Sequence, residues 1–362
     1  MIRSFHHSQF SLEQLRERKR EKITAVLPTR EVADTIASII ERLRALEGLI
    51  DQIVVVDASS SDGTARIAAE LGAEVHQESE LLSDFGPARG KGDAMWRALA
   101  VAEGDLIVYL DSDTRRFSPH FAIGLLGPLL CEDDVLFVKG HYRRPFVASD
   151  GSERPADGGR VTELTARPLL SAFYPELAGF VQPLAGELGA RRSLLERLPF
   201  ACGYAIETSM LLHARDELGG TEAMAQVDLD VRHNHHQPLR ELGPMAYAVL
   251  RVILERLRAA AARLDHHLDA RPVAGLEGPR PEHRELALRR AKERCPLAQQ
   301  GAVEVGIDAA DRHARARNVA YGGRSTSSTW ISPPSAVCSG GAWSSSRRPS
   351  ARRRSRITRS TA

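Results

Sequence analysis

Two carboxylates one residue apart follow a strongly apolar run. The segment LIVYLDSDTRR (106–116) passes from an expected strand directly into Asp111, Ser112 and Asp113. Residues i and i+2 of an extended chain point the same way, so Asp111 and Asp113 can face one site. Two hard oxygen donors suit Mg²⁺ or Mn²⁺ bound together with substrate phosphates, and such an ion would neutralise a leaving diphosphate. A solvated acidic turn is the alternative, because Asp and Ser are common in turns.

A loop of small and basic residues precedes this strand. The segment GPARGKGDAMW (86–96) places Arg89 and Lys91 among three glycines, just before an expected helix. Flexible backbone, cations and a helix N-terminus together favour phosphate binding. The spacing is not that of a GxxxxGK[ST] phosphate loop. A solvated loop with two basic residues explains the same pattern.

A second candidate anion site lies further along the chain, in GGRVTELTARP (158–168). Gly159 lets the backbone bend, Arg160 offers a planar fork of donors, and Thr162 adds a hydroxyl near a helix start. This set suits the carboxylate or phosphate of a second, anionic substrate. An ordinary capped helix is the alternative.

Two further residues are candidates for chemistry. His233 opens a histidine-rich segment, RHNHHQP (232–238), after an expected strand, and it could complete a metal shell. Surface histidines often have no specific role, so this histidine needs support from its surroundings. Glu207, in GYAIET, stands near a helix start in a partly apolar setting. It could be catalytic, or it could simply interact with the helix dipole.

The elements that must position these residues alternate between strands and helices. The expected strands cover 23–28, 52–57, 73–78 and 105–110, and the expected helices cover 33–46, 62–72 and 90–104. This alternation is typical of a mostly parallel α/β sheet, whose ligands bind beyond the carboxyl ends of the strands. Asp57, Asp111 and Asp113 all fall at that edge, so a shared crevice is expected.

Composition narrows the class of protein. Hydrophobic residues make up 43% of the 362 residues, enough for a substantial core. The four cysteines are scattered, as is usual in a reducing cytoplasm, and neither a membrane-spanning run nor a signal stretch is seen. Residues 321–362 contain eight arginines and no acidic residue, so the basic pI of 8.4 implies no nucleic-acid surface on the body. That tail is expected to be disordered, and the protein to be cytoplasmic.

Taken in order, the motifs resemble one family of GT-A glycosyltransferases. VVVDASSSDGT, GPARGKGDAMWRAL and YLDSD look like the nucleotide-sugar half of that fold. FVKGHYRRP, GGRVTELTARPLL, QPLAGE, PFACGYAIE and AQVDLDVRHNH resemble glucosyl-3-phosphoglycerate synthases and the similar actinobacterial-type mannosyl-3-phosphoglycerate synthases. The resemblance covers roughly residues 23–258 without a break. It implies a Rossmann-like, mostly parallel sheet with a mixed acceptor-binding half and C-terminal helices.

The resemblance also implies an activity: retaining transfer of a hexose from GDP-mannose or UDP-glucose to 3-phosphoglycerate, assisted by Mg²⁺ or Mn²⁺. Carried over by motif, the metal ligands would be Asp113 and His233. The nucleotide would contact Pro28, Glu31, Asp57, Ser59, Lys91, Asp111 and Ser112. The acceptor would contact Gly159, Arg160, Thr162 and His235. Glu207, Asp111 and the backbone around Leu184 would surround the transferred sugar, with Glu207 positioning it.

Three positions depart from the family pattern. Val32 stands where an acid is common, Val231 where arginine is frequent, and His235 where asparagine is usual. The first change concerns recognition of the base, and the other two concern the acceptor. From them we expect a relaxed choice between GDP-mannose and UDP-glucose.

The expected organisation has five segments, and the long helix of the fourth is a candidate homodimer surface. They are an N-terminal helical extension (1–22), a nucleotide-sugar-binding half (23–147), an acceptor-binding half (148–242), C-terminal helices (243–320) and the tail (321–362). A sugar-1-phosphate nucleotidyltransferase is a second hypothesis, but its glycine-rich loop normally follows the first strand, where PTREVADT stands here. In a third, the Arg-rich tail binds nucleic acid or an acidic partner. Deleting 321–362 would separate this last hypothesis from an enzymatic body.

Overall fold

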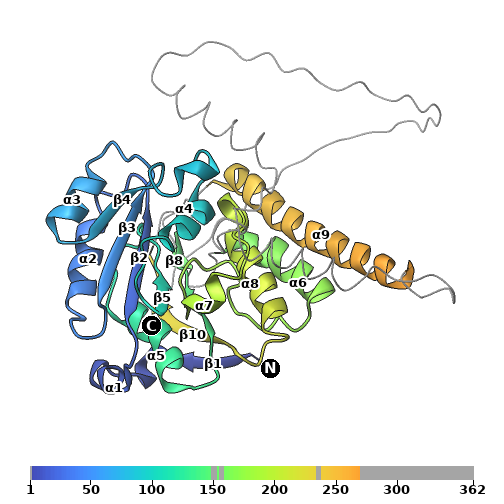
Figure 1. Ribbon diagram of the computed structural model, residues 1–362, viewed down its shortest axis with the longest axis horizontal. Helices are drawn as coiled ribbons and strands as arrows, with labels where there is room; N and C mark the ends of the chain where they lie inside the picture. Colours follow the sequence, from blue (N-terminus) through green and yellow to red (C-terminus); the bar gives the residue numbers. More distant parts are fainter. Residues whose placement is uncertain (1, 148–152, 155–158, 234–237, 270–362) are drawn as a thin grey trace, which may run out of the picture. The chain divides into compact units, whose positions relative to one another are not determined.

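The computed structural model describes residues 2–147, 153–154, 159–233 and 238–269 (Figure 1). The expected helix at 281–294 and the expected disordered tail at 321–362 lie outside the described residues, as does His235. None of the described helices is both long and apolar enough to cross a membrane.

An eight-stranded sheet forms the centre of the fold, in the order β1-β10-β6-β9-β5-β2-β3-β4. Its strands are β1 (Arg3–His6), β2 (Ile23–Thr29), β3 (Gln52–Asp57), β4 (Glu74–Gln77), β5 (Leu106–Tyr109), β6 (Phe137–Arg143), β9 (Leu188–Arg191) and β10 (Met224–Val231). β9 runs antiparallel to both of its neighbours, and the other pairings of this sheet are parallel. A separate pair, β7 (Phe146–Val147) and β8 (Glu153–Arg154), is antiparallel. The prediction of a mostly parallel α/β sheet is confirmed.

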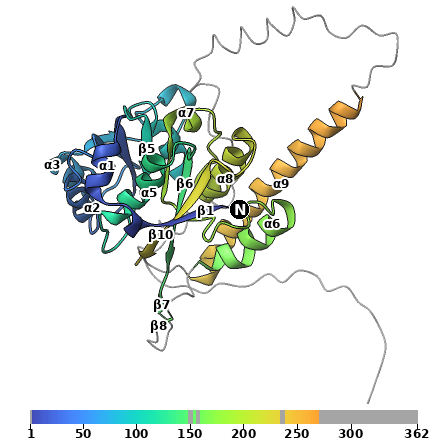
Figure 2. The same ribbon diagram turned by 90° about the horizontal axis from the view of Figure 1, so that it is seen from below.

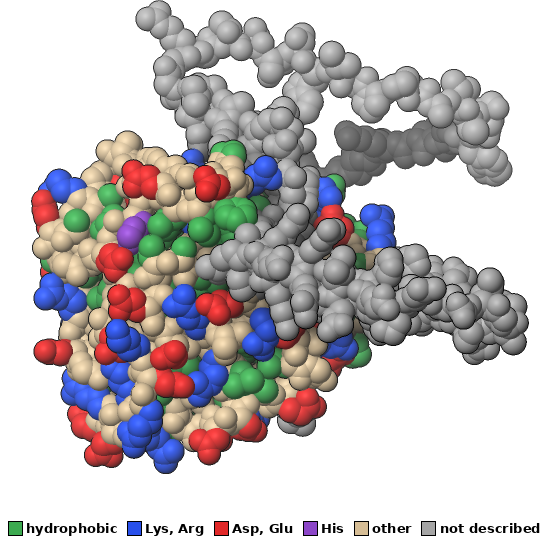
Figure 3. Space-filling model, in the orientation of Figure 1, with side chains coloured by type: hydrophobic (Ala, Val, Ile, Leu, Met, Phe, Trp, Pro, Cys, Tyr) green, Lys and Arg blue, Asp and Glu red, His purple; other side chains and the backbone are tan. Residues whose placement is uncertain are grey.

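Both faces of the sheet are covered by helices, because alternate residues of each strand point to opposite sides. In β5, Leu106 and Val108 enter one apolar cluster, whereas Ile107 and Tyr109 enter the other. The first cluster includes side chains from α1 (Leu12–Arg18), α2 (Ile36–Arg44), α3 (Thr64–Glu70) and α5 (His120–Cys131). The second includes side chains from α4 (Lys91–Ala98), α6 (Arg167–Phe173), α7 (Arg192–Leu195), α8 (Ile206–Glu217) and α9 (Leu239–Asp269). Figure 2 shows α1, α2 and α5 on one side of the sheet and α6, α8 and α9 on the other, and Figure 3 shows acidic and basic side chains interspersed over one face of the molecule.

The N-terminal segment differs from its prediction. A helix was expected over 11–22, and α1 occupies Leu12–Arg18, but the chain before it is not helical throughout. β1 pairs in parallel with β10, with Arg3 opposite Ala225 and His6 opposite Asp228. Four residues are too few for a readable alternation, and the partner strand lies more than 200 residues away along the chain. Sequence pattern alone could not place this strand.

β2 continues further than expected. Pro28 was expected to end the strand, yet it pairs with Val56 and the strand runs to Thr29. The pairing of β2 with β5 has already ended at Val26 and Tyr109. Proline lacks an amide proton, so it is tolerated where one side of the ladder has stopped.

The long helix α9 uses its apolar stripe within the chain. Ala248, Val249, Val252 and Ile253 are buried in the same apolar cluster as residues of α4 and α8. Residues 248–253 therefore cannot form the expected homodimer surface. The side chains of 260–269 lie outside the described residues.

Candidate active site

The carboxyl ends of the parallel strands bring three distant charged residues together. Asp111 follows β5, Lys91 is the first residue of α4, and Arg232 follows β10. Lys91 Nζ donates to Asp111 Oδ1 at 2.6 Å, and Arg232 Nη1 donates to Asp111 Oδ2 at 2.8 Å. Each oxygen of this carboxylate therefore has a cationic partner.

The electrostatics of Asp111 and Lys91 follow from this pairing. Burial alone would raise the pKa of Asp111, but the charges of Lys91 and Arg232 outweigh it and lower the pKa well below its usual range. Burial alone would lower the pKa of Lys91, but the carboxylates of Asp111 and Glu207 outweigh it and raise the pKa. Both groups are therefore held in their charged forms.

Arg232 is the most connected cation of the site, and the sequence analysis did not single it out. Its side chain is only 2% exposed, and its Nη2 donates to Asp113 Oδ1 at 2.6 Å. Its Nη1 also donates to the Tyr142 hydroxyl at 2.7 Å and lies 3.3 Å from Glu187 Oε1. The guanidinium stands over the Tyr142 ring, 5.3 Å from its centroid. The available signal was its position directly before His233, in RHNHHQP.

The QPLAGE segment contributes to the same site, although it was noted only for its family resemblance. Gly186 packs against Asp111, and a Cβ at this position would lie 2.2 Å from Asp111 Oδ1. Lys139, a buried residue of β6, donates to the carbonyl of Ala185. Burial lowers the pKa of Lys139 to about 8, although Glu207 opposes the shift, and burial raises the pKa of Glu187. Leu184, expected near the sugar, is half-buried two residues before Gly186.

Glu207 joins the site through Lys91, whose Nζ donates to Glu207 Oε1 at 2.9 Å. α8 begins at Ile206, after the short turn η4 (Gly203–Ala205). Gly92 of α4 packs so closely on the segment before this turn that a Cβ there would lie 1.9 Å from the Ala201 oxygen. This contact holds the starts of α4 and α8 together. We call the following residues the buried charge cluster: Lys91, Asp111, Glu187, Glu207 and Arg232.

Asp113 and His233 lie at the solvent side of this cluster. The Asp113 side chain is 58% exposed, against 16% for Asp111. The His233 carbonyl accepts a hydrogen bond from the Arg115 amide at 3.0 Å, which brings the two segments together two residues beyond Asp113. Asp113 offers a carboxylate oxygen and His233 an imidazole nitrogen, and these two kinds of ligand fit a divalent ion that also binds substrate oxygens.

Two of the expected nucleotide residues, Glu31 and Ser59, lie in the loops after β2 and β3. Glu31 and Ser59 both adopt left-handed backbone conformations, with φ of 52° and 57°. These loops are joined because the Glu31 amide donates to Ser60 Oγ at 2.8 Å and the Ser61 amide donates to Glu31 Oε1 at 2.8 Å. Strained non-glycine residues tend to occur at functional sites.

Asp57 and Ser112 are already engaged within the protein. The buried Asp57 carboxylate accepts hydrogen bonds from Thr29, from the amide and hydroxyl of Ser60, and from Gln77, at 2.6 to 3.3 Å. The Ser112 hydroxyl donates to the Pro28 carbonyl at 2.5 Å. These bonds fix the edge of the sheet, and direct nucleotide contact by either residue stays a prediction.

The expected acceptor residues begin the helical segment that leads into α6. Gly159 has a φ of 82°, and its carbonyl accepts from the Glu163 amide at 3.1 Å. Arg160 is half-buried, and the buried Thr162 opens a π-helical turn, Thr162–Ala166. The structure thus places these three residues in one turn, and their binding of an acceptor stays a prediction.

Comparison with known proteins gives consistent matches. Residues 24–170 match the family described as Glycosyl transferase family 2. The glucosyl-3-phosphoglycerate synthase of Petrotoga mobilis is 43% identical over 70% of this chain and 80% of its own length.

Solved structures extend these matches. The mannosyl-3-phosphoglycerate synthase of Rubrobacter xylanophilus is 53% identical with a TM-score of 0.66, over 72% of this chain and 82% of that chain. The glucosyl-3-phosphoglycerate synthase of Mycobacterium tuberculosis, crystallised with Mn²⁺, UDP-glucose and phosphoglyceric acid, is 40% identical with a TM-score of 0.64. That match covers 70% of this chain and 87% of the other.

Proposed function

Because this chain belongs to the family of glucosyl- and mannosyl-3-phosphoglycerate synthases, within Glycosyl transferase family 2, we propose that it transfers a hexose from a nucleotide sugar to 3-phosphoglycerate. The bond between the anomeric carbon and the nucleotide diphosphate breaks, and a bond to the acceptor hydroxyl forms. The products are a hexosyl-3-phosphoglycerate, the nucleoside diphosphate and the proton of that hydroxyl. The transfer retains the configuration of the anomeric carbon.

The observation that carries this proposal is the buried charge cluster at the carboxyl edge of the sheet. Lys91 bridges Asp111 and Glu207 with Nζ–O distances of 2.6 and 2.9 Å, so one cation orders two carboxylates that come from opposite halves of the chain. Such a preorganised set of charges can hold a polar sugar and its diphosphate in one orientation without reorganising during the reaction.

Within this cluster, each residue has a distinct role. Lys91 and Arg232 supply positive charge beside the position of the diphosphate, and Asp111 fixes both cations. Glu207, held by Lys91, accepts hydrogen bonds from sugar hydroxyls and orients the ring. Arg160 and Thr162 bind the phosphate or carboxylate of the acceptor, a role suited to a guanidinium fork beside a hydroxyl.

A divalent metal is held by Asp113 and His233. The ion is Mg²⁺ or Mn²⁺, as in the Mycobacterium tuberculosis enzyme, which was crystallised with either ion together with UDP. When bound, it neutralises charge on the leaving diphosphate. Asp113 is the better placed of the two aspartates for this role, because Asp111 is enclosed by Lys91 and Arg232.

Donor choice and stereochemistry are tested together. Purified protein is supplied with 3-phosphoglycerate and Mg²⁺, and with UDP-glucose, GDP-mannose, GDP-glucose or UDP-mannose in turn. We expect turnover with both UDP-glucose and GDP-mannose, and an α-linked product by NMR. Turnover of one donor alone would refute relaxed donor choice, and a β-linked product would refute retention. Absence of transfer with all four donors would contradict the proposed function.

Three further expectations belong to this proposal. Removing residues 321–362 leaves transfer intact, because the cluster and its loops lie in the body of the chain. The enzyme acts in the cytoplasm. It forms a homodimer, and since residues 248–253 of α9 are buried within the chain, the partner contacts other surfaces. Gel filtration with light scattering measures the last point.

A further inference from the structure

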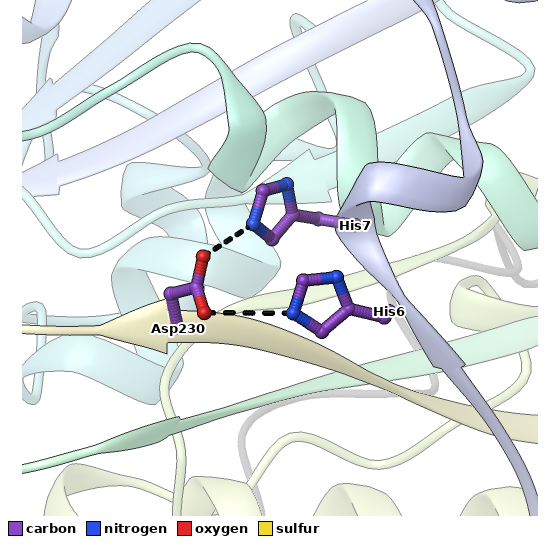
Figure 4. Close-up of side chains that lie close together, drawn as sticks. All are labelled: His6, His7 and Asp230. Carbon is purple, nitrogen blue, oxygen red and sulfur yellow. Dashed lines mark hydrogen bonds and ion pairs between the residues drawn. The ribbon is translucent and has the colours of Figure 1, made fainter.

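A second polar cluster lies at the same edge of the sheet, where β1 and β10 end. His6 is the last residue of β1, His7 is the first residue of the short turn η1 (His7–Gln9), and Asp230 is near the end of β10. Figure 4 shows both imidazoles directed at the Asp230 carboxylate. His7 Nε2 lies 2.6 Å from Asp230 Oδ2, and His6 Nε2 lies 3.5 Å from Asp230 Oδ1. We call these three residues the histidine cluster.

The backbone of β10 is shaped to present this carboxylate. The pairing of β10 with β6 shifts register between Asp228 and Val231, and Asp230 has a left-handed φ of 66°. A bulge of this kind redirects a side chain that regular pairing would place elsewhere. The Asp230 amide donates a hydrogen bond to Asp228 Oδ1 at 2.9 Å, and this bond supports the irregular conformation.

Groups around the cluster fix the two imidazoles. His6 Nδ1 accepts a hydrogen bond from the Ser8 amide at 3.2 Å and lies 2.7 Å from Ser8 Oγ, so the ring is held with Nε2 directed at Asp230. The His7 ring stacks on His120, with centroids 4.3 Å apart, and His120 is tied to the Leu229 carbonyl at 3.0 Å. Partners that fix ring orientation and tautomer are typical of metal-binding histidines.

We propose that His6, His7 and Asp230 bind a divalent transition-metal ion, with Zn²⁺ as the ion their chemistry fits best. The three candidate ligand atoms lie within 4.8 Å of one another, and they are two imidazole nitrogens and one carboxylate oxygen. That donor set suits Zn²⁺ and similar ions with a remaining position for water, and each imidazole in a shell makes Zn²⁺ a better fit than Mg²⁺. The site differs in ligand chemistry from the one at Asp113 and His233.

The bound ion would join the N-terminal strand to the strand that leads into the active site. His6 and His7 belong to the N-terminal segment, and Asp230 stands two residues before Arg232. Because its ligands come from both segments, the ion stabilises the pairing of β1 with β10. Arg143 Nη2 lies 3.4 Å from Asp230 Oδ1, and because the Arg143 side chain is 62% exposed it can turn into solvent when the ion binds.

The test compares metal binding by the full-length chain and matched variants. After treatment with a chelator and desalting, protein is titrated with Co²⁺ in excess Mg²⁺, and visible absorption and bound metal are measured. Because the sequence has 13 histidines, the difference between variants is the decisive quantity. We expect wild type to bind one more equivalent than His7→Gln, His6→Gln or Asp230→Asn, and Zn²⁺ to displace it.

The control is His76→Gln. His76 lies 2.7 Å from the Glu74 carboxylate, but among the described residues no second imidazole joins that pair. This variant is expected to bind as wild type does. Zn²⁺ should raise the melting temperature of wild type and of His76→Gln, but not that of His7→Gln. Equal metal stoichiometry and equal thermal shifts in wild type and all three cluster variants, each shown to be folded by circular dichroism, would overturn the proposal.

Discussion

The carboxyl edge of the sheet carries two polar clusters, and each has a carboxylate with nitrogen partners at both oxygens. In the buried charge cluster, the partners of Asp111 are Lys91 and Arg232, which stay charged. In the histidine cluster, the partners of Asp230 are His6, His7 and the exposed Arg143, and a neutral imidazole, unlike a guanidinium, can present a lone pair to a metal. The chemistry of the partner therefore decides whether a carboxylate maintains a fixed charge pattern or offers a place for an exchangeable ion.

The largest effect is expected from removing the buried cation of the first cluster. Arg232→Met leaves Asp111 and Glu187 without this partner, and loss of one member of a buried ion pair costs about 3–5 kcal/mol of folding stability. Loss of a preorganised charge should also lower kcat by about 100-fold or more. Urea unfolding and steady-state kinetics measure both.

The matched control for this prediction is Arg143→Met, which removes an exposed arginine beside Asp230. An exposed ion pair contributes about 1 kcal/mol at most. Similar losses of stability in the two variants would contradict the contrast between the clusters.

The next largest effect separates the two proposed metal sites. Asp113→Asn should lower activity by about 10- to 100-fold and raise the Mg²⁺ concentration needed for half-maximal rate, because a carboxylate ligand is lost. Asp230→Asn should leave that Mg²⁺ dependence unchanged. The rate is measured as a function of Mg²⁺ after chelator treatment, which by itself should abolish activity. An unchanged Mg²⁺ requirement in Asp113→Asn would exclude this residue as a ligand.

A packing change in the buried charge cluster gives a smaller effect. Gly186→Ala places a Cβ 2.2 Å from Asp111 Oδ1, so the carboxylate must move away from Lys91 or Arg232. We expect kcat to fall by about 10-fold, since small displacements of positioned groups are costly. The control is Gly243→Ala, where a Cβ meets no atom within 4 Å and the helix gains about 0.5–1 kcal/mol. Full activity of Gly186→Ala would show that Asp111 is not held as closely as proposed.

The last prediction concerns the pH dependence of stability and leaves the histidine cluster aside. Because burial lowers the pKa of Lys139 to about 8, against 10.5 for an exposed lysine, the unfolded chain binds more protons between these pH values. The free energy of unfolding should therefore rise with pH across this window, by up to about 3 kcal/mol from this residue.

Lys139→Met should remove this rise, whereas Lys22→Met, which changes an exposed lysine paired with Glu103, should retain it. Urea unfolding at pH 8 and pH 10 measures the difference. An equal rise in wild type and Lys139→Met would assign the pH dependence to another group.

Most of the sheet could be predicted because its signals are local. Apolar runs such as 52–57 and 105–110, followed by acids, indicate buried parallel strands whatever the rest of the chain does. The same reasoning failed at β1, whose four residues carry no readable period, and at Pro28, where the strand continues because pairing with β5 has already ended.

The motifs at the site were visible in the same way, and the pairings among them were not. Asp111, Asp113, Lys91, Glu207 and His233 were recognisable from residue type and spacing. Arg232 and Glu187 were overlooked, because a single charged residue beside a known motif has no distinctive pattern. For Asp57, the position predicted a nucleotide contact, which stays a prediction, and the hydrogen bonds of its carboxylate within the protein could not be read from the sequence.

The amino-acid sequence by itself determined the class of fold, the edge of the sheet where the chemistry lies and the kinds of residue present there. Only the tertiary structure decided which charges meet. Lys91 and Glu207 are 116 residues apart in the chain, Asp111 and Arg232 are 121 apart, and His7 and Asp230 are 223 apart. The physical reason is that strand periodicity is a local property, whereas the partner of a carboxylate depends on how distant segments pack.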